Sequence, residues 1–400
     1  MSENYFLLFK TADAEKRAWR NLAQERKKAL FPIIELTRGK QNRGAGKDAD
    51  GKPLTAEELR NTANIYGFEK NYRSTLDLMK PCEEVFVDLT REPSLSCFET
   101  DKLSLSADGY AVWVKFLTNL QNDWPNVVPT LIVNPSEDED EAQYGENLAG
   151  QFDALAAAFG KILYRVSVLE DSEFIYDIRL LSDKISSFVE DGGTFFVALD
   201  HEYIRPRNGQ VHAKRTSQII TSVLEAAPSV EIICLATSFP KSVTDIGDED
   251  YDIFPVEESY LYNMIASEHE NVQYGDYGSI NPIRNDEVII TQGWRPRIDY
   301  VSAHEGLQTY YFREKRDVLG KDPRTRKNIL APYSRHYRSV AGKVRQHSPY
   351  YEDLPMSWGC DEIKAAALGD VPSNSPSHWI SVRMEIHIVR LLRHLQLDPI

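Results

Sequence analysis

Polar residues stand where the short apolar runs of this chain end. These positions are Lys10, Glu35, Asp88, Asn134, Arg165, Asp200 with His201, Ser238, and Tyr274 with Asp276. In a β/α barrel the C-terminal ends of the parallel strands meet at one rim, where active sites are built. The sequence therefore predicts that these side chains share a site. The alternative is a barrel mouth whose charges simply balance one another.

Acids and bases in this set support two kinds of chemistry. The predicted catalytic residues are Lys10, Glu35, Asp88, Asp200, His201 and Asp276. In the first arrangement Glu35, Asp88, Asp200 and Asp276 supply oxygen ligands to Mg²⁺ or Mn²⁺, and a neighbouring histidine or lysine is the acid or base. In the second arrangement no metal is present. Lys10 and Arg165 then pair with the carboxylates, and a displaced pKa makes one carboxylate a general base.

His201 has either a catalytic or a structural role. It follows Asp200 directly, and successive side chains of a strand point to opposite faces. Both residues face a substrate only if the strand ends between them. A lone histidine is more often structural than catalytic, so both roles stay open.

Two loops that leave the same rim are basic and contain glycine, at residues 37–47 and 203–215. In an acidic protein, such loops indicate local capture of an anion, and phosphate suits arginine best. The predicted substrate-binding residues are Arg38, Arg43, Arg165, Arg205, Arg207, Tyr274 and Tyr277. The alternative is that both loops are charged because they are exposed.

Several familiar catalytic motifs are missing from the chain. The first basic loop is not a P-loop, because Gln41 stands where glycine is required and Asp48 follows Lys47. A Gly-x-Ser-x-Gly elbow, a Gly-x-Gly-x-x-Gly turn after the first strand and a His-Glu-x-x-His pair are all absent. Serine hydrolase, Rossmann dinucleotide and zincin chemistry are therefore disfavoured.

The elements that would position these residues alternate between apolar runs and helix-period segments. Such alternation indicates β-α-β units around a parallel sheet. The predicted strands are residues 5–9, 31–36, 84–89, 127–133, 162–167, 194–199, 230–235 and 271–274. Eight strands favour an α/β fold of the closed (β/α)8 TIM-like type, and an open doubly wound sheet is the alternative. Gly275 and Gly278 bracket Asp276 and Tyr277, which predicts a shaped turn at the last strand.

After Pro282 the alternation breaks, so we predict a barrel at residues 1–285 and an appended mixed or helical subdomain at 286–400. Residues 288–292, 297–300 and 307–313 resemble an antiparallel hairpin or small sheet. Residues 316–345 are predicted as a pair of helices, and 377–397 as an amphipathic helix with Arg383, His387 and Arg390. The many Lys and Arg residues here suit either a partner or nucleic-acid surface, or a tail packed on the acidic barrel.

Composition restricts the class of protein. The 400 residues carry 46 basic and 61 acidic side chains, a net charge of −15, which opposes general binding to nucleic acid. Four scattered cysteines show no metal-ligand spacing and are interpreted as reduced thiols. No apolar run approaches the roughly 20 residues of a membrane span, and no signal peptide is evident. We expect a cytoplasmic protein that does not bind membranes, in an oligomeric state that composition leaves open.

Several ordered motifs resemble those of the beta protein family of tailed phages and bacteria. They are Phe31-Pro-Ile-Ile-Glu35, Val87-Asp88, Thr237-Ser-Phe-Pro240, Tyr274-Gly-Asp-Tyr-Gly278 with Asn281-Pro282, and the block from Trp379 to His387. The resemblance covers nearly the whole chain. It implies a barrel-like β/α fold and a phage or bacterial context, sometimes beside mobile or antiviral defence genes. It carries no catalytic assignment for any residue.

Two functions therefore remain in competition. The first is an enzyme, with hydrolysis as one reaction class, that acts on a phosphorylated or nucleotide-like small molecule. The second is a non-catalytic recognition or effector module in phage–host conflict, which binds a co-encoded protein through its C-terminal region. Removing charge at Asp200 or Asp276 should abolish function under the first hypothesis and be silent under the second.

Overall fold

The computed structural model describes residues 4–48, 50–169, 173–283 and 294–400. Its centre is a closed barrel of parallel strands in the order β1-β2-β3-β4-β5-β6-β7-β9, in which β9 pairs with β1. The strands are β1 (Tyr5–Lys10), β2 (Leu30–Leu36), β3 (Val85–Leu89), β4 (Val127–Leu131), β5 (Lys161–Ser167), β6 (Thr194–Tyr203), β7 (Glu231–Thr237) and β9 (Val272–Asp276). The predicted TIM-like barrel is confirmed, because every predicted strand takes part in the closed sheet.

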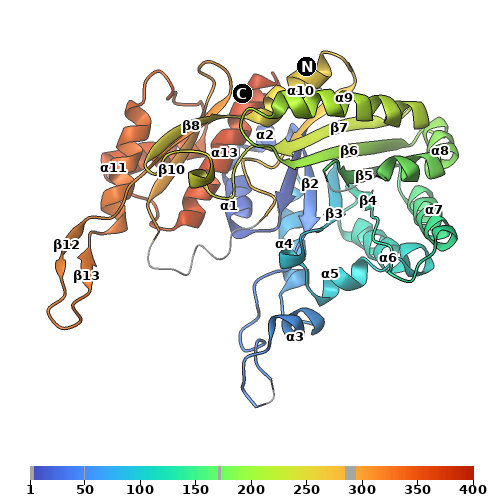
Figure 1. The fold of residues 1–400 in the computed structure, drawn as a ribbon, viewed down its shortest axis with the longest axis horizontal. Helices are drawn as coiled ribbons and strands as arrows, with labels where there is room; N and C mark the ends of the chain where they lie inside the picture. Colours follow the sequence, from blue (N-terminus) through green and yellow to red (C-terminus); the bar gives the residue numbers. More distant parts are fainter. Residues whose placement is uncertain (1–3, 49, 170–172, 284–293) are drawn as a thin grey trace.

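Helices connect the barrel strands, and apart from α3 they lie on the outer side of the barrel (Figure 1). They are α1 (Asp13–Asn21), α2 (Gln24–Lys28), α3 (Ala56–Asn61), α4 (Phe68–Met79), α5 (Phe98–Leu103), α6 (Ala107–Asp123), α7 (Glu141–Ala158), α8 (Phe174–Glu190), α9 (Gly209–Ala226) and α10 (Glu257–Ala266). Some helix starts are fixed locally: Thr55 and Glu58 form a capping box on α3, and the side chain of Asp140 accepts a hydrogen bond from the Gln143 N–H at the start of α7.

The barrel interior is layered along its axis. Phe6, Phe86 and Phe196 pack against one another toward the N-terminal ends of the strands, with ring centroids 5.3–5.9 Å apart. Leu8, Leu235 and Tyr277 form the next layer toward the C-terminal ends of the strands. The barrel is therefore a filled core rather than a channel, and its charged residues gather at the C-terminal mouth.

A second sheet stands beside the barrel in the order β10-β11-β8, with antiparallel pairing. It contains β8 (Tyr251–Pro255), β10 (Arg297–Ser302) and β11 (Gln308–Arg313). The predicted pairing of residues 297–300 with 307–313 is confirmed, whereas the predicted strand at 288–292 lies outside the described residues. Because β8 precedes the last barrel strand, the sheet combines segments from both sides of the predicted boundary near residue 285.

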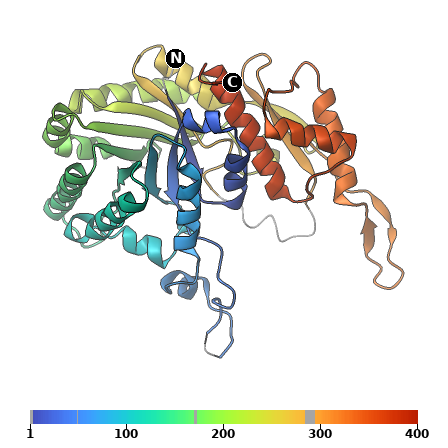
Figure 2. The ribbon, with the colours of Figure 1, turned by 180° about the vertical axis from the view of Figure 1, so that it is seen from behind.

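The end of the chain differs from two predictions. Residues 316–345 are not a helix pair: β12 (Val318–Lys321) and β13 (Asn328–Leu330) form a hairpin, and α11 (Tyr333–Gln346) follows. The Asp322–Lys327 segment supplies the turn, because Asp322 accepts hydrogen bonds from the N–H groups of Arg324 and Thr325. The hairpin and the α3 segment both project from the body in Figures 1 and 2.

The last helix is buried rather than amphipathic. The chain continues through α12 (Trp358–Leu368) to α13 (Pro376–His394), and α13 lies between α1 of the barrel and the second sheet (Figure 2). Arg383, His387 and Arg390 are all buried. The polar positions looked like a solvent-facing stripe, but they face ion-pair partners inside the protein. Among the helices of the described residues, none combines the length and apolar character of a membrane span.

Gly278 shows how the barrel and α13 fit together. It has a φ of +58°, and a Cβ atom there would lie 2.9 Å from Cε of Met384 on α13. We expect Gly278→Ala to lower the free energy of unfolding by about 1–3 kcal/mol, because an alanine is strained at this positive φ and the side chain of Met384 must move aside. Chemical denaturation measures this change.

The matched control is Gly342→Ala in α11, where a Cβ atom would meet nothing within 4 Å. Alanine is the better helix former, so this variant should be neutral or stabilised by about 1 kcal/mol. Equal stability of the two variants would show that α13 does not depend on close approach at Gly278.

Candidate active site

Strand alternation brings five charged residues into the barrel mouth. Phe6, Ile33, Phe86, Leu163 and Ala198 line the interior. Side chains two or four positions further along a strand share the same face. These are Lys10, Glu35, Asp88, Arg165 and Asp200, and the register places Lys10 beside Glu35 and Glu35 beside Asp88. Together with Tyr277 they are called the mouth cluster below.

Arg165 is the centre of the mouth cluster. Its Nη2 lies 3.1 Å from Glu35 Oε2, its Nη1 3.0 Å from Asp200 Oδ2 and its Nε 2.6 Å from Asp88 Oδ2. The Nε contact is an ion pair whose angles do not satisfy a hydrogen bond. The four side chains are at most 4% exposed. One guanidinium therefore holds three carboxylates from three other strands in the dry mouth.

An ammonium group and two hydroxyl groups complete the cluster. Lys10 Nζ lies 3.7 Å from Glu35 Oε1 and donates to the carbonyl oxygen of Pro282. The hydroxyl of Thr90 donates to Glu35 Oε1 at 2.9 Å. The phenol of Tyr277 donates to Asp200 Oδ2 at 2.6 Å. Each carboxylate is thus held at a fixed position by groups from different strands and loops.

The environment drives two carboxyl groups of the cluster in opposite directions. Burial opposes the charge on Glu35, but Lys10 and Arg165 outweigh it and lower the pKa of this carboxyl group. Burial dominates at Asp200 and raises its pKa despite the ion pair with Arg165. Two nearby carboxyl groups whose pKa values are pushed apart are the usual basis of an acid–base pair.

Asp276 is not part of the mouth cluster. It precedes Tyr277, so its side chain points through the outer face of the barrel wall. There it accepts hydrogen bonds from the phenols of Tyr5 and Tyr274 at 2.8 Å, and its Oδ2 lies 2.8 Å from Nε2 of His387 on α13. Asp276 therefore belongs to a second buried cluster, formed between the barrel and the C-terminal helix, and the predicted four-carboxylate set is divided.

Glu258 completes this second cluster. Donor atoms of Glu258, Asp276 and His387 all lie within 4.8 Å of one another, and all three side chains are buried. Such a trio is chemically able to hold a divalent metal. Asp276 already accepts hydrogen bonds from two phenols and the Gly278 N–H, so an ion would have to replace part of that network.

The mouth cluster offers less room for the predicted Mg²⁺ or Mn²⁺. The guanidinium of Arg165 occupies the space between Glu35, Asp88 and Asp200 where an ion would be coordinated. The carboxylates are thus already neutralised by an organic cation. The arrangement fits acid–base chemistry without displacement of any group, whereas metal binding requires Arg165 to move.

His201 lies outside the mouth. Strand β6 continues to Tyr203, so His201 points away from Asp200 toward α9. Its Nε2 lies 3.0 Å from the Thr216 hydroxyl and its Nδ1 3.3 Å from Nδ1 of His212. Burial, with His212 as the next cause, lowers its pKa to about 3. Its placement is that of a neutral packing residue against the helix.

The predicted anion-binding residues are dispersed. Arg165 and Tyr277 lie in the mouth cluster, while Tyr274 belongs to the Asp276 cluster. Arg38 stacks on the ring of Tyr66, with its Cζ 4.7 Å from the ring centroid. The remaining predicted residues are exposed on loops: Arg43, Arg205 and Arg207.

Sequence patterns missed several groups that shape the two clusters. Thr90 and Arg91 lie just beyond the end of β3, and Arg91 donates to the backbone oxygen of Arg165. Glu258 stands in the first turn of α10 and shows no pattern that links it to Asp276. The sequence pattern presents His387 only as a polar position of an amphipathic helix. Thr90 and Arg91 are found when the two residues that follow each predicted strand are counted as part of the rim.

Arg165→Met tests the hub of the mouth cluster. Three buried carboxylates would lose their partner, and we expect a loss of about 3–5 kcal/mol of stability at pH 7. The carboxyl pKa values rise when the cation is removed, so the folded variant binds protons that the unfolded chain releases. Its deficit should therefore shrink as the pH falls from 7 toward 5. Urea denaturation at both pH values measures this difference.

Arg73→Met is the control, because Arg73 forms exposed ion pairs with Glu69 and Asp123. Its loss should cost less than about 1 kcal/mol at either pH. A deficit for Arg165→Met that is equally small would contradict a hub role.

The second cluster predicts a pH dependence of stability. Burial raises the pKa of Glu258 to about 7. Burial opposes charge on His387, but Asp276 outweighs it and raises the pKa of the imidazole. In both cases the folded state holds protons more tightly than the unfolded chain. Stability should therefore fall as the pH rises from about 4.5 through 7.

Glu258→Gln should flatten this fall by on the order of 3 kcal/mol, because the amide does not titrate. The exposed Glu270→Gln is the control and should keep the wild-type slope. Equilibrium unfolding across this pH range measures the slopes. A Glu258→Gln profile parallel to that of the wild type would show that this carboxyl group is not protonated in the folded protein.

Comparison with known proteins places the chain in a family. Protein beta of Enterobacteria phage P4 is 27% identical over 398 residues, covering 96% of this chain and 92% of that protein. A termite-gut xylanase of family GH10 with a bacterial Ig-like domain matches 69% of this chain and 68% of its own at 10% identity, with a TM-score of 0.39. A thermostable mutant xylanase from Cellvibrio japonicus matches 68% and 85% at 10% identity, with a TM-score of 0.38. Scores this low carry no argument about activity. A family model described as Beta protein matches residues 5–393, and the chain therefore belongs to the Beta protein family.

Proposed function

We propose that this protein is a barrel enzyme that performs acid–base chemistry on an anionic small molecule at the mouth cluster. The observation that carries the proposal is the opposite displacement of two carboxyl pKa values around one guanidinium: that of Glu35 is lowered and that of Asp200 is raised. An ordinary structural ion pair has no need of such a difference, whereas proton transfer benefits from it.

Each group of the cluster has a role in this proposal. Asp200 is the proton donor and acceptor, and the phenol of Tyr277 holds its Oδ2 in place at 2.6 Å. Glu35 stays ionised and fixes Arg165. Lys10 and Arg165 are the groups that bind the anion, and a phosphate suits the planar guanidinium. A phosphorylated or nucleotide-like substrate is therefore proposed, with hydrolysis as the reaction class.

A metal-assisted reaction at the mouth cluster requires more rearrangement than a metal-free one. It requires Mg²⁺ or Mn²⁺ to enter between carboxylates that Arg165 already bridges. Asp276, the fourth predicted ligand, faces His387 on the other side of the barrel wall. We therefore favour a reaction that uses only the side chains of the mouth.

Asp200→Asn is the test of this function. The amide keeps the shape of the side chain but cannot transfer the proton, so turnover should fall by about 10²–10⁴-fold while the protein stays folded. The assay is a hydrolysis screen of nucleotides and sugar phosphates with and without Mg²⁺ or Mn²⁺, supported by ligand-induced shifts in thermal unfolding. Asp153→Asn, at an exposed ion pair with Lys184 on α8, is the control.

The proposal fails if the wild type hydrolyses none of these compounds and no compound stabilises it, or if Asp200→Asn turns over like the wild type. Activity that appears only with metal and is lost in Glu258→Gln would instead assign the chemistry to the second cluster.

A recognition role in phage–host conflict is the second candidate, and one feature favours it. The β12–β13 hairpin exposes apolar side chains on a projecting arm: Val318 is 55%, Leu319 58% and Ile329 45% exposed. Such residues suit contact with a co-encoded protein. Under this alternative Leu319→Asp abolishes the phenotype of the gene in its host and Asp200→Asn leaves it intact, whereas the enzyme proposal requires the reverse.

A further inference from the structure

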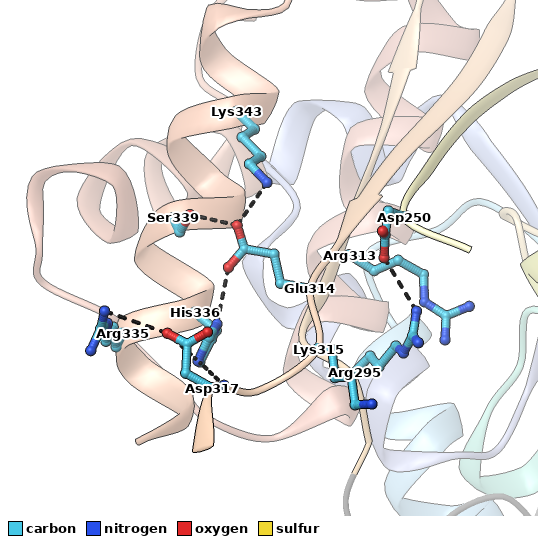
Figure 3. A pocket seen from close by; sticks show the side chains of 10 residues that line it. All are labelled: Asp250, Arg295, Arg313, Glu314, Lys315, Asp317, Arg335, His336, Ser339 and Lys343. Carbon is cyan, nitrogen blue, oxygen red and sulfur yellow. Dashed lines mark hydrogen bonds and ion pairs between the residues drawn. The ribbon is translucent and has the colours of Figure 1, made fainter. Parts of the chain in front are cut away.

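A basic pocket lies in the C-terminal region, away from the residues of the mouth cluster (Figure 3). It encloses about 470 Å³ between β11, the segment that follows it, α11 and the residue that precedes β8. Its cations are Arg295, Arg313, Lys315, Arg335 and Lys343, against the acids Asp250, Glu314 and Asp317. The lining is therefore basic in a protein whose net charge is −15.

One wall of this pocket is fixed by internal contacts. Glu314 Oε1 lies 2.8 Å from Lys343 Nζ and also accepts from the Ser339 hydroxyl, and its Oε2 lies 3.0 Å from His336 Nδ1. Burial opposes charge on Glu314, but Lys343, Ser339 and His336 outweigh it and lower its pKa. Figure 3 shows this carboxylate directed toward α11. The charge of Glu314 is therefore used in contacts with α11 and does not neutralise the cations on the opposite side of the pocket.

The opposite side carries positive charge without a protein partner. Arg295 is paired with Asp250 and Glu249. Among the described residues, the side chains of Arg313 and Lys315 have neither an ion-pair partner nor a hydrogen-bond acceptor, and Figure 3 joins them to no neighbour. Arg313 is half-buried, so water does not fully replace the missing anion.

Like charges surround Arg313 as well. It stands directly opposite Arg297 in the antiparallel pairing of β10 and β11, an arrangement that destabilises a sheet. Burial lowers the pKa of Arg313, and Arg297 and Arg295 lower it further. Arg297 lies 3.1 Å from Asp299, a carboxylate that it shares with Arg383, whereas the side chain of Arg313 has no carboxylate partner among the described residues. An anion bound beside Arg313 would remove this cost.

We propose that this pocket binds a small molecule bearing a phosphoryl group, with the guanidinium of Arg313 as the bidentate contact and Lys315 as a second cation. The volume suits a small phosphorylated ligand, since ligand pockets commonly enclose about 300–1,000 Å³. Arginine presents a planar fork to phosphate oxygens, and lysine adds a point charge. The site uses none of the mouth residues and goes beyond the function proposed above.

Calorimetric titration of the full-length protein with inorganic pyrophosphate tests the site. The wild type should bind it saturably, and Arg313→Gln should weaken the affinity by at least about tenfold, because charge-assisted hydrogen bonds are lost. Arg324→Gln removes one exposed positive charge from the hairpin in the same region and should bind like the wild type. No saturable binding by the wild type, a loss below tenfold, or an equal loss in Arg324→Gln overturns the proposal.

Unfolding of Arg313→Gln without ligand provides an independent check. Removal of the charge opposite Arg297 should leave the stability unchanged or raise it. A destabilised variant would mean that Arg313 holds the fold together, and it would overturn the assignment of a binding residue.

Two further titrations distinguish this pocket from the barrel mouth and from a nucleic-acid surface. Binding that persists in Arg313→Gln but disappears in Lys10→Gln places the anion at the barrel mouth and overturns the pocket, while it supports the proposed function. The second titration uses a fluorescent single-stranded oligonucleotide. If it binds through Arg313 and pyrophosphate does not displace it, the ligand of the pocket is nucleic acid and the small-molecule proposal is overturned. Pyrophosphate binding retained in Lys10→Gln and lost in Arg313→Gln supports the pocket, whatever the hydrolysis screen shows.

Discussion

The contact of one guanidinium with three buried carboxylates is the constraint on which the barrel mouth depends. Arg165 reaches Glu35, Asp88 and Asp200 within 3.1 Å, and these residues come from four different strands. Carboxylates in a dry site repel one another and lose hydration, so they remain ionised only beside a cation. The cluster therefore ties opposite sides of the barrel together at the end where its apolar filling stops.

The same physics makes the mouth chemically asymmetric. Both carboxyl groups are buried, but Glu35 has two cations close by, whereas Asp200 has one cation, Arg165, and a phenol. The pKa values of these two carboxyl groups therefore move apart although the residue types are nearly the same. A network that served only to neutralise charge would not require this difference, and the enzyme hypothesis depends on it.

The C-terminal region is bound to the barrel by a second set of buried charges. His387 of α13 contacts Asp276, and Arg26 next to β2 contacts Asp398 at 2.8 Å. Arg383, which pairs with Asp299 inside the C-terminal region at 3.1 Å, also donates a hydrogen bond to the Ser279 hydroxyl beyond β9 at 3.2 Å. Removing one partner of a buried pair leaves an unpaired charge, so these contacts favour a single arrangement of the two parts. The basic pocket differs from them because its Arg313 has no such partner among the described residues.

The sequence alone determined the barrel and most of its mouth. Apolar runs with polar ends at Lys10, Glu35, Asp88, Arg165 and Asp200 fix both the strands and the inward faces, since alternation along a strand is local. Tertiary structure decided the rest. Asp276 turns outward because β9 places Tyr277 inward, and His201 faces α9 because β6 runs on to Tyr203. Glu258 and His387 reach Asp276 from helices distant in the chain, and partners brought together by packing leave no spacing in the sequence for a pattern to detect.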